Sequence, residues 1–218
     1  MPKKGNKIEL EKKAKINFTS GCPNNCEYCY ETDVLKIYDP VIPNNKFIQI
    51  LDMNMLGVYI KKLGRKELYK KLNSLPKKKW EFVCGVDYRF MDQEIAFIMK
   101  KKGFIKIRWA WDYQFSLQKK QKKVYEYFIK AGYKPKDLSV FMLVNWKIPY
   151  LECCMKLDLL KVWNVKVNDC CHDGGYKRAK PKYWTIDQIK KFRALCRKHN
   201  QMVLFGIDPE YKGKLLWR

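Results

Sequence analysis

The chain has 218 residues, of which 47% are hydrophobic and 15% aromatic, so its length suits one domain that buries a substantial core. Its formal net charge of +24 indicates an anionic partner without indicating a chemistry. The longest apolar runs are far shorter than the ~20 residues that span a bilayer, and the lysine-rich residues 1–15 precede no apolar signal core. Nine cysteines without regular framework spacing fit a reducing compartment rather than a disulfide scaffold. We therefore expect a cytoplasmic protein that makes no contact with membranes.

Short apolar or β-branched segments alternate with helical patterns along the chain, which is typical of parallel sheets built from βαβ units. The predicted strands cover residues 16–19, 47–51, 80–86, 105–111, 139–144 and 165–168. The predicted helices cover residues 92–102, 116–131, 149–163 and 185–200.

Local signals set the ends and faces of these helices. The first two stop at Gly103 and Gly132, and the last begins with a capping box of Thr185 and Gln188. Asn200 is a plausible end of the last helix, where a charged His199 would be favoured by the helix dipole. In the third helix the apolar positions with helical spacing are Leu151, Cys154, Met155, Leu159 and Val162.

The most informative feature is a cysteine motif in residues 18–30. Cys22, Cys26 and Cys29 have the spacing C-x3-C-x2-C. Three thiolates that close together can hold a [4Fe–4S] cluster while leaving its fourth iron without a protein ligand. Such an iron is open to a small molecule.

This segment resembles the cluster loop of the radical S-adenosylmethionine (radical SAM) superfamily, including the short apolar strand before it and Tyr28 just before the third cysteine. The resemblance extends over roughly residues 15–175. It implies an α/β fold, a partial (β/α)6 TIM-like barrel with parallel strands over residues 15–176. A basic segment, residues 1–14, would precede this barrel, and a C-terminal helix and tail, residues 177–218, would complete the same domain.

The resemblance also implies the cofactors. Cys22, Cys26 and Cys29 would be the metal ligands of the [4Fe–4S] cluster, whose open iron would bind S-adenosyl-L-methionine. Reductive cleavage of that molecule would give a 5′-deoxyadenosyl radical, which abstracts hydrogen from a substrate. Tyr28 would pack beside the adenine.

Polar residues recur at the downstream ends of the predicted strands, where barrels of parallel strands build their sites. In chain order they are Asp52 and Asn54, Asp87 and Arg89, Asp112, Asn145, and Asp169 with Cys170. Side-chain alternation directs Asp87, Asp112 and Cys170 to the interior, and Cys84 outward into the core. Some of these polar residues are expected to be ordinary helix caps or loop residues.

The cofactor-binding residues expected here differ from those of the better-known family members. The Gly-Gly-Glu type motif that many members place after the second strand, to hold the methionine amino group, is absent here. Asp52 and Asn54 stand at that place and are assigned to the role, with Asp87 and Asn145 as further cofactor contacts.

Three residues are placed nearer the substrate as candidate catalytic residues: Asp112, Arg89 and Cys170. Cys170 could donate a hydrogen atom or bind a second metal. A packed thiol is the more common role of a free cysteine.

The positive charge leaves several partners open. It suits an acidic electron donor such as a flavodoxin or ferredoxin, and it suits a nucleic acid or nucleotide substrate. Lysine rather than arginine supplies most of the excess, so runs such as residues 77–79 and 119–123 also fit solvated faces.

Two other functions remain open at this point. One is an activase that installs a glycyl radical on a partner enzyme, because the Ser-Gly-Cys-Pro opening of the loop is similar to those proteins. The other is a non-catalytic zinc or iron–sulfur protein that binds nucleic acid. A zinc site would join Cys26 and Cys29 to two of Cys170, Cys171 and His172, since zinc prefers four nitrogen or sulfur ligands.

Overall fold

A computed structural model of the chain describes residues 13–172 and 182–205. Residues 1–12 of the predicted N-terminal segment lie outside these ranges, as do residues 177–181 and 206–218 of the predicted C-terminal helix and tail. The strands are β1 Ala14–Ile16, β2 Thr19–Ser20, β3 Lys36–Ile37, β4 Phe47–Ile50, β5 Lys79–Phe82, β6 Ile107–Ala110, β7 Leu138–Val144 and β8 Lys166–Cys171. The helices are α1 Met55–Leu63, α2 Arg65–Ser74, α3 Gln93–Lys102, α4 Gln118–Lys130, α5 Tyr150–Val162 and α6 Ile186–Phe205, with single 3₁₀ turns η1 Phe115–Leu117 and η2 Pro135–Asp137.

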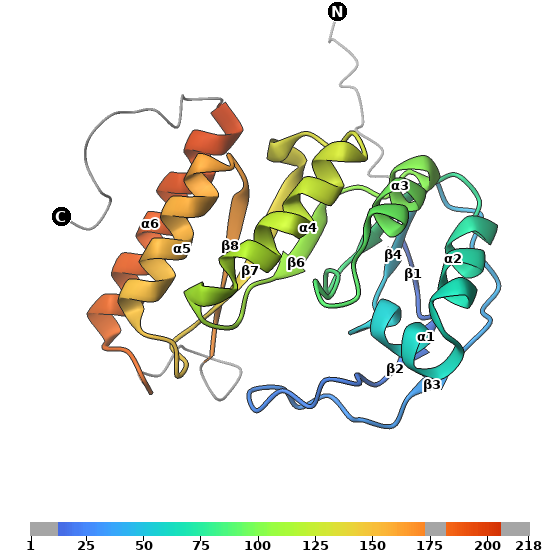
Figure 1. Cartoon of the computed structure of the whole chain (residues 1–218), viewed down its shortest axis with the longest axis horizontal. Helices are drawn as coiled ribbons and strands as arrows, with labels where there is room; N and C mark the ends of the chain where they lie inside the picture. The colour runs from blue at the N-terminus through green and yellow to red at the C-terminus, as the bar shows by residue number, and fades with distance from the viewer. Residues whose placement is uncertain (1–12, 173–181, 206–218) are drawn as a thin grey trace, which may run out of the picture.

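The fold is α/β with parallel strands. One sheet has the order β1-β4-β5 and another the order β6-β7-β8, and all four pairings within them are parallel. Two isolated parallel bridges, Trp80 with Phe104 and Val86 with Trp109, join the two sheets. Figure 1 shows β1 and β4 side by side on the right, with β6, β7 and β8 following toward the left. Within the described residues β1 and β8 do not pair, so no closed barrel forms.

The buried faces of the strands pack against the helices as the alternation predicts. Trp109 of β6 is fully buried and its ring lies 5.8 Å from that of Phe128 in α4. On the opposite face of the strands, Arg108 forms an ion pair with Glu81, which also accepts a hydrogen bond of 2.9 Å from Gln49. Arg108 and Glu81 therefore lie on the face of the strands that is turned away from the helices.

The N-terminal strands differ from the prediction. The predicted strand 16–19 is divided between β1 and β2, and β2 pairs antiparallel with β3. The helices α1 and α2 follow β4 directly. Asn54 caps α1 by accepting a hydrogen bond of 3.0 Å from the backbone N–H of Gly57.

The buried face of α5 agrees with the prediction at Cys154 and differs from it elsewhere. Leu151, Met155 and Val162 are exposed, whereas the buried residues of this helix are Cys153, Cys154, Lys156, Leu157 and Leu160. Helix α5 is apolar on both sides, so helical spacing alone does not identify the face that packs. Lys156 is a buried lysine on that face, and its Nζ donates a hydrogen bond to the carbonyl oxygen of Trp111.

Helix α6 continues past Asn200 and covers the open edge of β8, which corrects the predicted end. Asn200 accepts a hydrogen bond of 2.8 Å from the N–H of Val167 and donates one of 2.7 Å to its carbonyl oxygen. His199 lies within the length of α6, and its side chain is buried. Its Nε2 lies 2.7 Å from the carbonyl oxygen of Val165. Burial lowers the pKa of His199, so it is not the charged C-terminal residue that we expected. The capping box of Thr185 and Gln188 is confirmed, with bonds of 2.9 and 3.2 Å.

None of the helices in the described ranges is long and apolar enough to cross a membrane.

Candidate functional site

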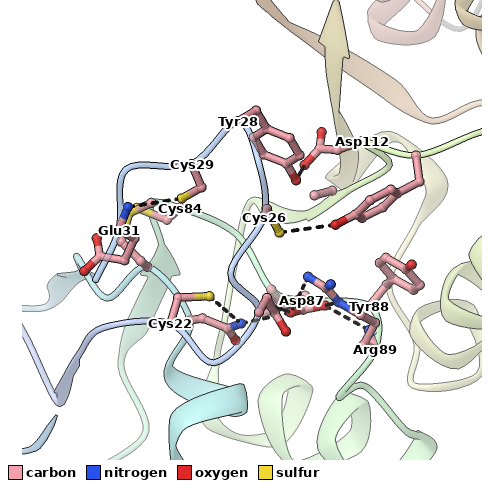
Figure 2. Close-up of a pocket in the computed structure, with 16 residues that line it drawn as sticks. Cys22, Cys26, Tyr28, Cys29, Glu31, Cys84, Asp87, Tyr88, Arg89 and Asp112 are labelled. Atoms are coloured by element: carbon pink, nitrogen blue, oxygen red, sulfur yellow. Dashed lines mark hydrogen bonds and ion pairs between the residues drawn. The ribbon is translucent and has the colours of Figure 1, made fainter. Parts of the chain in front are cut away.

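The three motif cysteines line one cavity at the carboxyl ends of the parallel strands (Figure 2). They lie on the loop between β2 and β3, hereafter the cysteine loop, residues 21–35, which passes beneath the row of strands in Figure 1. The opposite walls come from the segments that follow β4, β5 and β6. The residues around the cavity are Cys22, Asn24, Cys26, Tyr28, Cys29, Glu31, Met53, Asn54, Cys84, Val86, Asp87, Tyr88, Arg89, Ala110, Asp112 and Tyr113.

The cysteine loop begins at a glycine that no other residue could replace without strain. Gly21 has φ +80, and a Cβ atom built on it would lie 2.5 Å from the carbonyl oxygen of Val34. The next residue, Cys22, donates its backbone N–H to Thr32 over 2.8 Å, which closes the loop. The backbone at Gly21 therefore lies close to the backbone at Val34, and this close approach fixes where Cys22 enters the cavity.

Each cysteine sulfur accepts one hydrogen bond, and the three donors come from different segments. Asn54 Nδ2 lies 3.4 Å from Cys22 Sγ, and the Tyr113 hydroxyl lies 3.2 Å from Cys26 Sγ. The backbone N–H of Glu31 lies 3.4 Å from Cys29 Sγ. Donors directed at sulfur stabilise thiolates and tune clusters bound to them.

Asp87 is the centre of a hydrogen-bond network on the wall opposite Cys22. Its Oδ2 accepts a bond of 2.9 Å from Asn54 Nδ2 and a further bond from Asn24 Nδ2. Arg89 binds both carboxylate oxygens, with distances of 2.8 and 3.0 Å. Burial lowers the pKa of Arg89, but the pairing with Asp87 and the nearby thiol of Cys26 outweigh it and raise the pKa, so Arg89 stays charged. Figure 2 shows this pair below Cys26.

Asp112 forms a second carboxylate centre. Its Oδ2 accepts a bond of 2.9 Å from the Tyr28 hydroxyl, and its Oδ1 accepts one of 3.1 Å from the N–H of Leu143. Burial raises the pKa of Asp112, opposed by these two bonds and by the charge of Lys156. Burial therefore favours the neutral form of the Asp112 carboxyl group.

Lys156 is the buried cation behind Asp112. Its side chain is fully buried in α5, and its Nζ lies 3.4 Å from the carbonyl oxygen of Trp111 and 5.7 Å from the centre of the Trp111 ring. Burial lowers the pKa of Lys156, and the charges of Cys153 and Asp112 oppose this shift. Trp111, next in sequence to Asp112, thus contacts this buried lysine through its carbonyl oxygen and its ring.

Tyr28 connects the cysteine loop to the far strands. Its ring lies 6.0 Å from that of Trp146, edge to face, and 6.5 Å from that of Tyr113. Beside it, Lys147 forms an exposed ion pair of 2.7 Å with Glu27 of the loop. These contacts hold the loop over β6 and β7.

Eight of the eleven sequence-predicted site residues line this cavity: Cys22, Cys26, Cys29, Tyr28, Asn54, Asp87, Arg89 and Asp112. The structure does not bring the other three, Asp52, Asn145 and Cys170, to it.

Asp52 is buried and turned back toward the N-terminal strands. Its carboxylate accepts hydrogen bonds from the backbone N–H of Phe18, at 3.0 Å, and from the Thr19 hydroxyl, at 2.5 Å. The side chain has the same parity as Ile48 and Ile50, which face the helices, whereas Gln49 faces inward. Applied to β4, the alternation would have predicted this direction. Asp52 holds the junction of β1 and β2.

Asn145 and Cys170 also lie away from the cavity walls. Asn145 is buried with φ +59, which turns its side chain out of the alternation of β7. Its Oδ1 accepts bonds of 3.1 and 3.2 Å from the N–H groups of Lys182 and Tyr183, so it holds that segment in place. Cys170 is exposed, and its Sγ lies 3.7 Å from the carbonyl oxygen of Asn168.

Sequence reasoning missed several residues of the cavity. Asn24 and Tyr113 lie in loops, where residue type does not predict direction. Cys84 was expected in the core but lines the cavity, because β5 ends at Phe82 and Gly85 has φ +81, so the alternation stops before Cys84. A glycine shortly after a strand was the available signal.

Across residues 13–172 and 182–205, no three His, Cys, Asp or Glu side chains lie close enough together to hold a single metal ion. The zinc set of Cys26, Cys29 and the Cys170–His172 segment is thus not assembled there. In a [4Fe–4S] cluster each thiolate binds its own iron, so the ligands surround the cluster instead of meeting at one ion. Three cysteines of one loop on one cavity, each with a donor at its sulfur, fit that requirement.

Comparison with known proteins gives a fold relationship. No protein-family profile matches the chain, and no curated protein matches its sequence. Among solved structures, it is similar to the radical S-adenosylmethionine methyltransferase TsrM from Kitasatospora setae, whose structure contains cobalamin and a [4Fe–4S] cluster. The TM-score is 0.57 at 10% identity, over 72% of this chain and 36% of that one, so the chain spans about a third of the length of TsrM. The likeness shows that the α/β fold is of the kind found in a radical SAM enzyme.

Proposed function

We propose that this protein is a radical SAM enzyme in which Cys22, Cys26 and Cys29 hold a [4Fe–4S] cluster. The observation that carries the proposal is that all three cysteines line one cavity and each sulfur accepts a hydrogen bond. The cavity lies at the carboxyl ends of parallel strands, where such folds place their chemistry. The row of six parallel strands is interpreted as a partial (β/α)6 barrel, and the similarity to TsrM supports both assignments.

When bound, the cluster and S-adenosylmethionine would supply an adenosyl radical that removes hydrogen from a substrate. The protein's own residues would position and protect these groups. Asn54 holds Cys22 and Asp87 with one amide, so a change at either partner is transmitted to the other. We assign Asp87 the role of the absent Gly-Gly-Glu type motif, in which an ammonium group would replace one of the donors that now occupy its carboxylate.

Tyr28 and Asp112 act as a pair on the opposite wall. The Tyr28 hydroxyl donates to Asp112 Oδ2, which fixes the tyrosine ring as a flat apolar surface for the adenine. Asp112 can hold or take up a proton at this oxygen, with Lys156 behind it as the compensating charge. The aromatic rings of Tyr28 and Tyr113 line one side of the cavity, and Trp146 packs against Tyr28.

The reducing electron must come from outside the chain. An acidic donor such as a flavodoxin or ferredoxin suits the net charge of +24. The cobalamin of TsrM is not carried over to this protein.

Reconstitution tests the cluster. Protein purified without oxygen and treated with iron and sulfide should contain about four irons and four sulfides per chain. Cys22→Ala, Cys26→Ala and Cys29→Ala should each abolish the cluster. Cys84→Ala tests a thiol in the same cavity outside the motif, and Cys196→Ala tests a buried thiol of α6, and both should keep it. Retention of the full iron content by any of the three motif variants, or equal loss in the control variants, would contradict the assignment.

A further inference from the structure

A second cavity adjoins the cysteine cavity and shares two of its residues. Tyr88 and Arg89, from the loop after β5, line both. The remaining walls of the second cavity are Met91 and, from α4, Lys120, Lys123, Val124 and Tyr127. Helix α4 begins shortly after β6 ends, so this cavity lies at the same end of the strands as the site.

The second cavity is lined by three cations and no carboxylate. Arg89 is already paired with Asp87. Lys120 and Lys123 are exposed, and no ion pair to either is found among the described residues. The nearby Glu126 faces Lys122 instead, at 4.0 Å. The two lysines therefore leave positive charge at the entrance of the cavity.

The position of these lysines is unfavourable for the isolated helix. Lys119, Lys120, Lys122 and Lys123 all lie in the first two turns of α4, whose first turn has no acidic residue. The positive end of the helix dipole disfavours cations there, and lysines three and four apart repel one another. An anion bound between Lys120 and Lys123 relieves both effects.

Aromatic rings accompany the charges. The Arg89 guanidinium lies 5.6 Å from the Tyr88 ring centre and 5.9 Å from that of Tyr113, and Lys123 Nζ lies 5.9 Å from the Tyr127 ring centre. Cations beside flat rings suit a ligand that combines a phosphate with a planar base.

Another lysine-lined cavity of the described residues lies away from the site, and a lysine there has contacts within the fold. It lies at the amino ends of β4 and β5, around Lys46, Lys77, Lys78 and Lys79. There Lys78 Nζ donates to the carbonyl oxygens of Pro43 and Asn45, at 2.9 and 3.2 Å, and so stabilises the fold. Of these two cavities, the one at α4 shares residues with the cysteine cavity.

We propose that the cavity formed by Arg89, Lys120, Lys123, Tyr88 and Tyr127 is a phosphate subsite for the substrate, which is a nucleotide, free or within a single strand. The inference rests on the proposed function, because it takes the adjoining cysteine cavity as the place of reaction. In this arrangement the phosphate of the substrate binds at α4. The reacting part of the substrate lies at Arg89, on the wall that the two cavities share.

Binding to the full chain tests the subsite with two probes. Uridine 5′-monophosphate, with uridine as its phosphate-free control, represents a free nucleotide, and a fluorescent single strand of about eight thymidine nucleotides represents a strand. The cavity variant Lys120→Gln/Lys123→Gln should weaken binding at least tenfold. The control Lys119→Gln/Lys122→Gln removes the same charge from the same helix outside the cavity, and should weaken it less than threefold.

For the strand, losing two phosphate contacts should also lower the slope of log affinity against log salt by about 1.4. Binding of uridine 5′-monophosphate but not of uridine identifies a free nucleotide, and binding of the strand alone identifies a nucleic acid. Equal losses in the two double variants, or no binding of either probe, would overturn the subsite. Iron content is measured on the same samples, so a failure of the cluster is recognised separately.

Discussion

Replacing Asp52 tests whether this buried carboxylate supports the fold or the cofactor. It accepts hydrogen bonds from the Phe18 N–H and the Thr19 hydroxyl and is about 1% exposed. Bonds to a charged acceptor contribute roughly 1.5 to 3 kcal/mol each, so losing both costs about 3 to 6 kcal/mol. Burial raises the pKa of Asp52, which means that removing its charge offsets part of this loss. We expect Asp52→Ala to destabilise the protein by about 3 kcal/mol.

For a chain of this length such a loss lowers Tm by about 6 to 12 °C. Calorimetry measures Tm, and equilibrium dialysis on reconstituted protein measures S-adenosylmethionine affinity, which should stay within about twofold of the unmodified protein at temperatures where the variant is folded. Asp39→Ala, which removes an exposed carboxylate paired with Lys71, is the control and should leave Tm unchanged. An unchanged Tm for Asp52→Ala together with a tenfold loss of cofactor affinity would refute this reasoning.

Three further predictions concern the loop, the pH dependence and the buried lysine. Gly21→Ala brings a Cβ within 2.5 Å of a backbone carbonyl and should reduce iron content by more than half, whereas Gly64→Ala, with φ +89 and open space around it, should keep it, as an iron assay will show. Burial lowers the pKa of His199 below 6.5, so the unfolded chain binds the proton first and stability falls as pH drops below about 6.5. His199→Gln should flatten that part of the stability curve in urea titrations, and an unchanged slope would contradict the assignment. Lys156→Met removes a buried cation whose charge lowers the pKa of Asp112, so that pKa should rise. The low-pH limb of 5′-deoxyadenosine formation should move upward accordingly, and an unmoved profile at full iron content would exclude this coupling.

The part of the site that the sequence could predict is the part set by local rules. The cysteine loop is contiguous, so its three thiols share a cavity whatever else the chain does. Asp112 follows a regular strand, and alternation along β6 placed it correctly. Asn54 combines a helix cap with a cavity contact, and its position after β4 indicated both.

The rest depends on contacts that alternation does not govern. Asn145 turns away because its φ is positive, and the direction of Cys84 changes because β5 ends at Phe82 and Gly85 has a positive φ. The buried face of α5 includes Lys156, whose contact Trp111 lies on another segment far away in sequence. The sequence predicts that Asn200 ends a helix, but in the structure its side-chain amide hydrogen-bonds the backbone of Val167 in β8. Each of these depends on long-range packing, which one sequence does not reveal.

The cleavage of S-adenosylmethionine tests the central proposal most directly. Reconstituted protein, reduced chemically and given S-adenosylmethionine without substrate, should release 5′-deoxyadenosine slowly, measured by chromatography. The Cys26→Ala variant should release none, because the proposed cluster requires that thiolate, while Cys196→Ala should match the unmodified protein. Iron-loaded protein that forms no 5′-deoxyadenosine, or a Cys26→Ala variant that forms it at the full rate, would contradict the account.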